Sequence, residues 1–265
     1  MISVIIPTLG TRETELTRLF NSLRNQTNQD FEVVLVSQQN HEKVAELIAQ
    51  SGLTIKHIKI DKMGLSHSRN IGLKYVTGDI ITFSDDDCWY NRTAFQEVSE
   101  SFTNTNDAIV CFQIYDPDID EYYKNYSNQP KDRLSFKEIF RKSSIEIFLN
   151  LKKVDKKHVS FDENFGLGAK YPSGEENIFL AQLHRLGYKI AYIPKVVVYH
   201  KKPTIQSRLT FKAFMSKGPL FKEIFNTPIG LFLLTSLFVK KFRNLERPFY
   251  LYTSAIKELF SYKKN

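Results

Sequence analysis

Residues 80–87 read Ile80-Ile81-Thr82-Phe83-Ser84-Asp85-Asp86-Asp87, an apolar run followed closely by three acids. A short apolar run that ends in polar residues is typical of a buried strand. Three carboxylates at the end of such a strand repel one another by roughly 1–4 kcal/mol per pair unless a cation lies among them. Because Mg²⁺ and Mn²⁺ prefer carboxylate oxygens, the stretch predicts a metal site at the strand end. The alternative is a solvated acidic turn that caps a helix beginning near Asn91.

Strand and helix patterns alternate through the residues before this stretch. Apolar runs predict four strands, at Ile2–Ile6, Phe31–Val36, Thr54–Ile60 and Asp79–Phe83. Helical spacing predicts three helices between them, at Thr11–Gln26, His41–Gln50 and Leu65–Tyr75. Repeated βα units predict an α/β domain with a largely parallel sheet, which binds ligands off the carboxyl ends of its strands. One crevice can therefore receive three turns: Pro7-Thr8-Leu9, Ser37-Gln38 and Asp85-Asp86-Asp87.

Composition limits the class of protein. The chain has 265 residues, of which 42% are hydrophobic, and this suffices for one large domain or for a core domain with an appendage. The spacing of its two cysteines, Cys88 and Cys111, matches neither a disulfide framework nor a zinc site, which favours a reducing compartment. The start MISVIIPTLG lacks the features of a signal peptide, so we expect a cytoplasmic protein. Residues 115–157 are polar without a clear period and predict a partly mobile insertion.

The excess positive charge lies in the C-terminal tail. Residues 1–200 hold 24 Lys and Arg against 26 Asp and Glu, whereas residues 201–265 hold 13 against 3. The tail contains the apolar run 228–239 between basic clusters, and twelve helical residues span about 18 Å, too short for a bilayer core of about 30 Å. We expect peripheral contact of the tail with the inner face of the cell membrane and no nucleic-acid partner. The alternative is a core helix that packs on the main domain.

Three further clusters are candidates for the crevice. Residues 64–72, Gly64-Leu65-Ser66-His67-Ser68-Arg69-Asn70-Ile71-Gly72, open a helix with a glycine turn and an arginine, which suits a phosphate or a pyrimidine as well as ordinary helix capping. A glycine loop at 166–169 precedes Glu175 and Glu176, which form the first turn of a helix that continues through the helical run 178–186. Helix-dipole complementarity alone would also favour acids there. His200 ends the predicted strand Lys195–Tyr199, where it is either a surface residue or a further cation ligand.

Taken in order, these motifs resemble one known family. They read Pro-Thr-x-x-x-Arg after the first strand, Gly-Leu-Ser-x-x-Arg-Asn, Phe-Ser-Asp-Asp-Asp, Gly-Glu-Glu-Asn before a helix, and Tyr-His after Ile-Pro. The set resembles the family 2 glycosyltransferases of the GT-A fold, inverting enzymes that use nucleotide-activated sugars in bacterial polysaccharide assembly. The resemblance implies a catalytic domain at 1–202, with a nucleotide part at about 1–114 and an acceptor part at about 115–202. It implies a Rossmann-like mixed, mainly parallel sheet flanked by helices, and a helical C-terminal extension at 203–265.

The resemblance also implies roles for single residues. Asp87, Asp85 and His200 would hold Mn²⁺ or Mg²⁺. Glu176, with Glu175 before it, would supply the general base that removes a proton from a hydroxyl of a glycan or lipid-linked glycan acceptor. The nucleotide sugar, with a UDP-sugar favoured, would be held by Pro7, Thr8, Arg12, Ser37, Gly64, Ser66, Arg69, Asn70, Asp85 and Asp86.

Two departures from the family pattern leave questions open. The family usually has Asp at Ser37, in contact with uracil, so the nucleobase stays open. Its Glu-Asp is here Glu175-Glu176, so either carboxylate can face the acceptor.

Two other classes of protein also stay open. A nucleotidyltransferase acting on sugar phosphates would need a glycine-rich, basic loop after the first strand, and a non-catalytic membrane or nucleic-acid binding module would leave the acidic triplet without a role.

Overall fold

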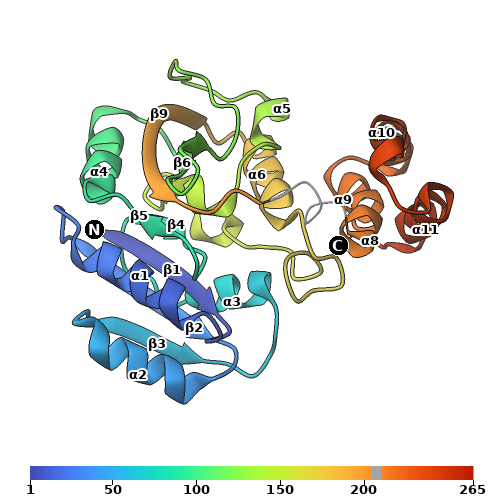
Figure 1. Cartoon of the computed structure of the whole chain (residues 1–265). Helices are drawn as coiled ribbons and strands as arrows, with labels where there is room; N and C mark the ends of the chain where they lie inside the picture. Colours follow the sequence, from blue (N-terminus) through green and yellow to red (C-terminus); the bar gives the residue numbers. More distant parts are fainter. Residues whose placement is uncertain (204–209, 265) are drawn as a thin grey trace.

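The strands form one curved sheet of mixed direction (Figure 1). The computed structural model describes residues 1–203 and 210–264, and within them nine strands are ordered β3-β2-β1-β4-β8-β6-β9-β5, with β7 paired to β6. The strands are β1 (Ile2–Thr8), β2 (Phe31–Ser37), β3 (Ile55–Lys59), β4 (Ile80–Phe83), β5 (Trp89–Tyr90), β6 (Ile109–Asp116), β7 (Glu121–Tyr122), β8 (Ile147–Asn150) and β9 (Ile190–Tyr199). Most paired residues belong to the parallel pairs of β1 with β2 and β4, β2 with β3, and β6 with β9. The predicted mixed, mainly parallel sheet is confirmed.

Helices cover both faces of this sheet. They are α1 (Glu13–Arg24), α2 (His41–Ser51), α3 (Leu65–Gly72), α4 (Ala94–Asn104), α5 (Phe136–Ile139) and α6 (Glu175–Arg185), with short 3₁₀ turns at Ser144–Glu146 and Lys156–His158. Side chains of α1 and α4 share one buried cluster with β1 and β2, while α6 packs into the cluster on the other face. The sheet is therefore the middle of three layers.

One predicted insertion is in fact part of the sheet. The interpretation of 115–157 as a partly mobile segment is wrong for β8, whose four residues are buried and lie between β4 and β6. The strand has only four residues, of which Ile147, Phe148 and Leu149 are apolar, and such a run is too short to distinguish a strand from a buried turn. The last strand was also predicted too short, because β9 starts at Ile190 and contains Pro194. Its register on β6 shifts near Pro194, as expected where proline cannot donate to the ladder.

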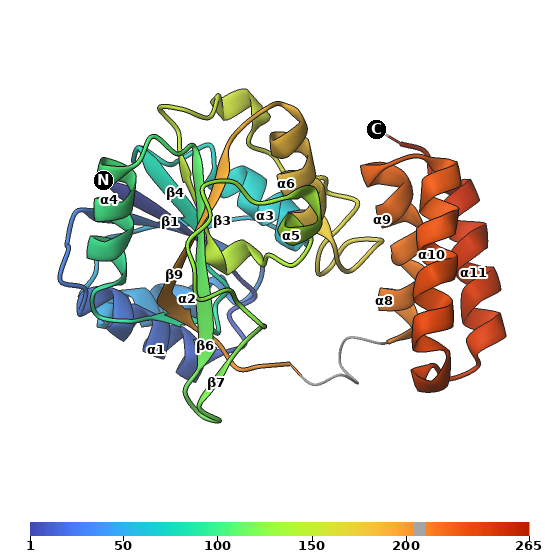
Figure 2. The ribbon, with the colours of Figure 1, turned by 90° about the horizontal axis from the view of Figure 1, so that it is seen from above.

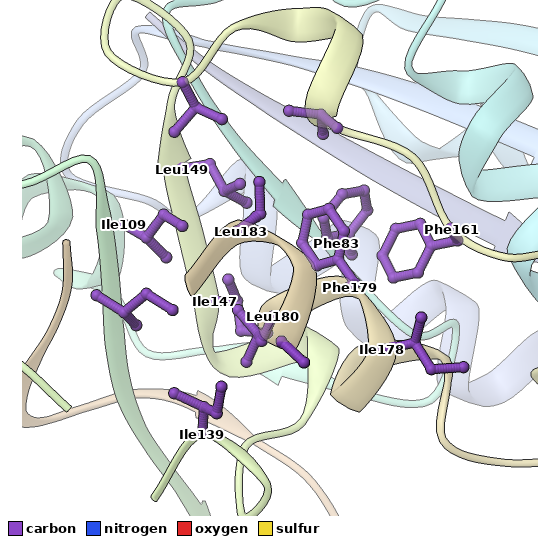
Figure 3. Close-up of a cluster of buried hydrophobic side chains, with 14 of the residues drawn as sticks. Phe83, Ile109, Ile139, Ile147, Leu149, Phe161, Ile178, Phe179, Leu180 and Leu183 are labelled. Carbon is purple, nitrogen blue, oxygen red and sulfur yellow. The ribbon is translucent and has the colours of Figure 1, made fainter. Parts of the chain in front are cut away.

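The buried face of α6 fixes the start of that helix over the sheet (Figure 3). Phe179, Leu180 and Leu183 of α6 are all at most 1% exposed and belong to the same cluster as Phe83 of β4 and Leu149 of β8. Burial of side chains of this size contributes about 1.5–3 kcal/mol each. The glutamates at the first turn of α6 are thus anchored to the end of β4 that carries the acidic triplet.

The C-terminal extension is a helical bundle beside the main domain (Figure 2). It consists of α8 (Phe211–Met215), α9 (Lys217–Ile224), α10 (Thr227–Lys241), a 3₁₀ turn at Phe242–Asn244, and α11 (Pro248–Ser261). The bundle has its own buried cluster, formed by Phe214, Leu234, Phe238, Leu245, Leu251, Ala255 and Leu259. Helix α9 joins it to the main domain, because Leu220 and Ile224 belong to the core of the latter. Within the described residues, every helix is too short or too polar to span a bilayer.

Candidate active site

A cavity of about 380 Å³ lies at the carboxyl ends of β1, β2 and β4. Eight of the residues predicted from the sequence line it: Pro7, Thr8, Arg12, Gly64, Asp85, Asp86, Asp87 and His200. Leu9, Thr11, Gln38, Met63, Leu65, Leu167 and Gly168 complete its wall. Two loops meet there, since the N–H of Leu65 donates to the carbonyl of Leu167 at 2.8 Å and a Cβ on Gly168 would come within 3.3 Å of Gly64. Glycine is required at this close backbone approach.

Four predicted nucleotide contacts lie behind the cavity wall rather than in it. The Ser37 hydroxyl lies 2.6 Å from Nδ1 of His41 and 2.7 Å from Nε2 of His57. The Ser66 hydroxyl and the Asn70 amide donate to the backbone carbonyls of the 161–165 loop. Arg69 is only 1% exposed. These residues hold the loops that form the wall, and their direct contact with a nucleotide stays a prediction.

Asp86 ties the first turn of the cavity to the acidic triplet. The Thr8 hydroxyl donates to its Oδ2 at 2.7 Å, and Nη1 of Arg12 donates to its Oδ1 at 3.1 Å. Burial raises the pKa of Asp86, and the hydrogen bond from Thr8 and the charge of Arg12 only partly oppose this. Asp86 therefore shapes the turn that follows β1.

Asp85, Asp87 and His200 present one ligand atom each within 4.8 Å of one another. Nδ1 of His200 lies 2.6 Å from the carbonyl oxygen of Lys201, which can only accept, so this nitrogen carries the proton and Nε2 faces Asp87 at 3.1 Å. A neutral imidazole whose other nitrogen is fixed by a backbone carbonyl is the usual form of a histidine ligand. Two carboxylates and an imidazole suit Mn²⁺, and also Mg²⁺ through the carboxylates. The donor set fits a divalent cation.

The electrostatics of this group agree with that fit. Burial alone would raise the pKa of Asp87, but the hydrogen bond with His200 and the charges of His200 and Arg12 outweigh it and lower the pKa. Burial lowers the pKa of His200, and the contacts with Asp87 and the charge of Asp85 reverse this into a net rise. With no cation bound, the raised pKa favours a proton on Nε2 of His200 in the contact with Asp87, and a divalent cation would take the place of that proton. Arg12 supplies a second positive charge beside Asp87.

Arg69 connects the triplet to the start of α6. Its Nη2 donates to Asp85 Oδ1 at 2.9 Å and to the Ser144 hydroxyl at 2.8 Å, and its Nη1 donates to Glu175 Oε1 at 3.2 Å. Burial raises the pKa of Glu175 to about 8, the charge of Glu176 adds to the rise, and the charge of Arg69 opposes it. One buried guanidinium therefore sets the spacing between a candidate metal ligand and a candidate base.

Glu176 points into a different environment from Glu175. It is partly exposed, whereas Glu175 is buried. Two lysines lie within electrostatic range of Glu176: Lys124, which is bonded to Glu146 and Ser143, and Lys217 of α9. Nζ of Lys217 lies 3.3 Å from the Ser173 hydroxyl, and burial lowers its pKa. The C-terminal extension therefore contributes a cation beside the two glutamates.

The comparison with protein families now identifies the chain. The model described as glycosyl transferase family 2 matches residues 3–167, which is more than half of the sequence and contains the whole acidic triplet. The chain belongs to glycosyl transferase family 2. Over 266 aligned residues it is 21% identical to the putative glycosyltransferase EpsH of Bacillus subtilis strain 168, covering 92% of this chain and 71% of EpsH. Membership gives no support to the nucleotidyltransferase and binding-module alternatives.

Solved structures share the fold of this family 2 glycosyltransferase. Staphylococcus aureus TarS 1–349 in complex with UDP-GlcNAc superposes with a TM-score of 0.64 at 17% identity, over 92% of this chain and 73% of TarS 1–349. The mannosyltransferase PcManGT from Pyrobaculum calidifontis, in complex with GDP-Man and Mn²⁺, gives 0.60 at 14% identity, over 97% and 69% of the two chains. The GT-A fold inferred from the sequence is therefore confirmed, with the C-terminal helices included in the alignment.

Some site residues of this glycosyltransferase could not be found by motif. Gln38 was noted only as part of a strand end, yet its Oε1 accepts the N–H of Gly64 at 2.6 Å and so joins two sides of the cavity. Ser144 and Lys217 come from segments that carry no recognised motif. Their place in the site depends on tertiary packing between distant parts of the chain.

Proposed function

We propose that this family 2 glycosyltransferase moves a sugar from a nucleoside-diphosphate sugar to an acceptor hydroxyl with inversion, with the help of Mn²⁺ or Mg²⁺. The observation that carries the proposal is the convergence of Asp85, Asp87 and His200 on the wall of the cavity at the ends of β1, β2 and β4. A carboxylate and imidazole cluster beside a cavity at the ends of parallel strands suits a cation-bound diphosphate.

The charges around the cavity explain how the donor would be activated. A divalent cation, when bound, would neutralise negative charge that develops on the leaving nucleoside diphosphate. Arg12 is half exposed at the cavity wall and bonded to Asp86 and Asp87, so it is placed to add positive charge to the same phosphates once the acids bind a cation. Preorganised groups of this kind act without further rearrangement during the reaction.

The pair of glutamates divides into two roles in this proposal. Glu175 is buried, holds its proton at neutral pH because its pKa is about 8, and is held by Arg69. Glu176 is partly exposed and has two lysines nearby, so it is the better candidate for the carboxylate that removes the acceptor proton. A general base of this kind contributes about 10²–10⁴ to the rate. A single displacement assisted by one base inverts the anomeric carbon.

The donor and the acceptor are proposed from different observations. TarS has been solved with UDP-GlcNAc and PcManGT with GDP-Man, so a nucleotide sugar is supported and a UDP-sugar is our preferred donor. The relative EpsH is itself a putative glycosyltransferase. We propose a glycan or a lipid-linked glycan as acceptor, in the synthesis of a cell-surface polysaccharide.

A panel of nucleotide sugars tests the donor. Purified protein is mixed with UDP-, GDP- and dTDP-sugars with and without Mn²⁺, and thermal stability and release of the nucleoside diphosphate are measured. A donor at 100 times its Kd should stabilise the protein by about 2.7 kcal/mol by mass action, and chelation of the metal with EDTA should remove most of that effect. Absence of both stabilisation and nucleotide release for every donor would contradict the proposal.

We also propose that the C-terminal extension brings the enzyme to the cytoplasmic face of an anionic membrane. Phe232 of α10 is 69% exposed, as is Val239, and basic residues follow at Lys240 and Arg243. Exposed apolar side chains next to cations suit an interface with anionic lipid.

Sedimentation with vesicles tests this contact. The full chain should sediment with vesicles that contain phosphatidylglycerol and less with neutral vesicles, because each lysine or arginine near an anionic surface contributes about 1 kcal/mol. Added NaCl should weaken vesicle binding without abolishing it, because salt does not screen the apolar contact. Phe232→Ser should remove the binding that persists at high salt. A surface variant is preferable to truncation, because Leu220 and Ile224 of the extension belong to the main core. Equal sedimentation with neutral and anionic vesicles would contradict the electrostatic contribution to this membrane contact.

A further inference from the structure

Four aromatic rings form a row across four strands next to the candidate metal site. The sheet register places Trp89 of β5 opposite Tyr199 of β9, Tyr199 opposite Tyr115 of β6, and Tyr115 opposite Tyr122 of β7. Directly opposed residues lie on the same face of a sheet, so the four rings are neighbours. Their centroids are separated by 5.7, 6.4 and 5.4 Å along the row. We call these four residues the aromatic row.

The row is partly open to solvent. Tyr122, at its outer end, is 48% exposed, and Trp89, Tyr115 and Tyr199 are partly exposed. Cross-strand aromatic pairs stabilise sheets, and that explains why such rings pair. It does not require a continuous, partly exposed row at one end of the sheet. A row of partly exposed rings that continues over four strands suits a binding surface.

The position of the row relates it to the reaction. Trp89 follows Asp87 by two residues, and Tyr199 immediately precedes His200. The row is nevertheless separate from the nucleotide cavity, because none of its four rings is among the residues that line that cavity in the described part of the chain. Its inner end therefore adjoins Asp87 and His200 along the chain, and its four rings lie outside the wall of the nucleotide cavity.

The inner end of the row is held rigidly. The guanidinium carbon of Arg18 lies 3.5 Å from the centroid of the Trp89 ring, and Nη2 of Arg18 donates to the backbone carbonyl of Asp87 at 3.0 Å. One ring of the row is thus fixed to the backbone of the acidic triplet. A preorganised aromatic surface costs little conformational entropy on binding.

We propose that the aromatic row binds the sugar chain of the acceptor, several units long, and leads its terminal hydroxyl to the candidate metal site. Sugar rings have apolar C–H faces and polar rims, and tyrosine and tryptophan offer flat apolar faces with a polar group at the edge. The row spans three ring-to-ring steps, so it contacts more than one sugar unit. The inference rests on the proposed glycosyl transfer and adds that the acceptor is an oligosaccharide rather than a single sugar.

The sequence supplies a direct probe, because Trp89 is the only tryptophan in the chain. Its fluorescence is followed while cellotetraose or chitotetraose is added to the full-length protein in the presence of UDP and Mn²⁺, with glucose as the monosaccharide control. We expect a saturable change with at least one tetrasaccharide and a much weaker one with glucose. Tyr122→Ala should weaken the tetrasaccharide affinity about three- to tenfold, while Tyr122→Phe stays within about twofold.

Two controls separate this inference from the proposed function. Tyr250→Ala removes a tyrosine that is 60% exposed on α11, outside the row, and should leave the titration unchanged. Mn²⁺-dependent UDP binding, measured by calorimetry, should be the same in all variants. If UDP binds but neither tetrasaccharide changes the Trp89 signal, or if Tyr122→Ala titrates like the wild type, the row is not an acceptor site. Loss of UDP binding in the wild type would instead contradict the proposed function.

Discussion

Two sets of adjacent acids belong to the candidate site of this glycosyltransferase, one after β4 and one at the start of α6, and the fold treats them differently. In the triplet, each carboxylate has its own cationic or hydroxyl partner: Arg69 for Asp85, Thr8 for Asp86, and His200 for Asp87. At the start of α6, Glu175 is buried against Arg69 while Glu176 remains partly exposed. Identical neighbours in the sequence therefore become chemically different through the direction of each side chain and its burial.

The triplet and the glutamate pair differ in how the fold controls their charge. The triplet is arranged to gather negative charge, since Asp85 and Asp87 turn toward His200 while Asp86 turns toward the loop after β1. At the start of α6, burial raises the pKa of Glu175 to about 8 and so favours its protonated form, while Glu176 stays partly exposed. Neighbouring carboxylates in environments as different as these can take different roles in one reaction.

The largest expected effect tests the division within the triplet. Asp87→Ala should abolish turnover and remove the Mn²⁺ dependence of UDP binding, because a metal ligand is lost. Asp86→Asn is the matched variant, and it should keep the Mn²⁺ response while weakening UDP binding through the displaced Thr8 and Arg12. Calorimetry with and without Mn²⁺ measures both. If Asp87→Ala binds UDP with an unchanged response to Mn²⁺, Asp87 is not a metal ligand.

The next effect tests the division within the glutamate pair. Glu176→Gln should lower kcat by about 10² or more with UDP binding changed only a few-fold, because the amide keeps the shape and loses the basicity. Glu175→Gln should cost much less at pH 7, since an amide resembles the protonated carboxyl that a pKa of about 8 implies. Steady-state kinetics separate the two. A larger loss at Glu175 would exchange their roles, and near-normal activity in both would exclude a base at this position.

How far these roles are readable from sequence differs between the two regions. The triplet could be predicted because an apolar run before it locates the strand end and because all three acids are contiguous. The confirmed βα order likewise follows from local periodicity. The burial of Arg69 between Asp85 and Glu175, by contrast, could not be predicted, because burial of a charged side chain depends on partners distant in sequence.

The acceptor side was less predictable for the same physical reason. β8 is a short apolar segment whose identity as a central strand depends on β4 and β6 at its sides. Lys217 approaches Glu176 because α9 packs on α6, although some forty residues separate the two in the chain. The extension was predicted as a membrane appendage, with a core helix at the apolar run 228–239 as the alternative. The helix that completes the main core is α9, whereas Leu234 and Phe238 of the apolar run pack in the separate cluster of the bundle.

A smaller effect is expected where α9 meets the loop before α6. Gly174 has a φ of 102°, and a Cβ there would lie 2.7 Å from a methyl group of Leu220. Gly174→Ala should therefore destabilise the protein by about 1–3 kcal/mol and lower kcat by displacing the two glutamates. Leu220→Ala in the same background relieves the contact and should restore part of kcat, although it leaves a cavity of its own. Thermal unfolding and kinetics of both variants measure this, and additive losses in the double variant would show that the contact does not position α6.

The smallest effect concerns the charge that surrounds the glutamate pair. Groups facing the pair are Arg69 and Asp85 from the donor side, Lys124 with Glu146 from the acceptor side, and Lys217 from α9. Lys217→Met removes one positive charge while keeping the length of the side chain, so protonation of the pair becomes easier and the acidic limb of the kcat profile should move to higher pH by a fraction of a unit. Activity should fall a few-fold near pH 6 and little near pH 8.

Lys217→Arg should restore the wild-type profile, and Lys257→Met, on an exposed position of α11, is the control for general loss of charge. A profile of Lys217→Met that is lowered equally at every pH would mean that Lys217 acts only through its hydrogen bond to the Ser173 hydroxyl.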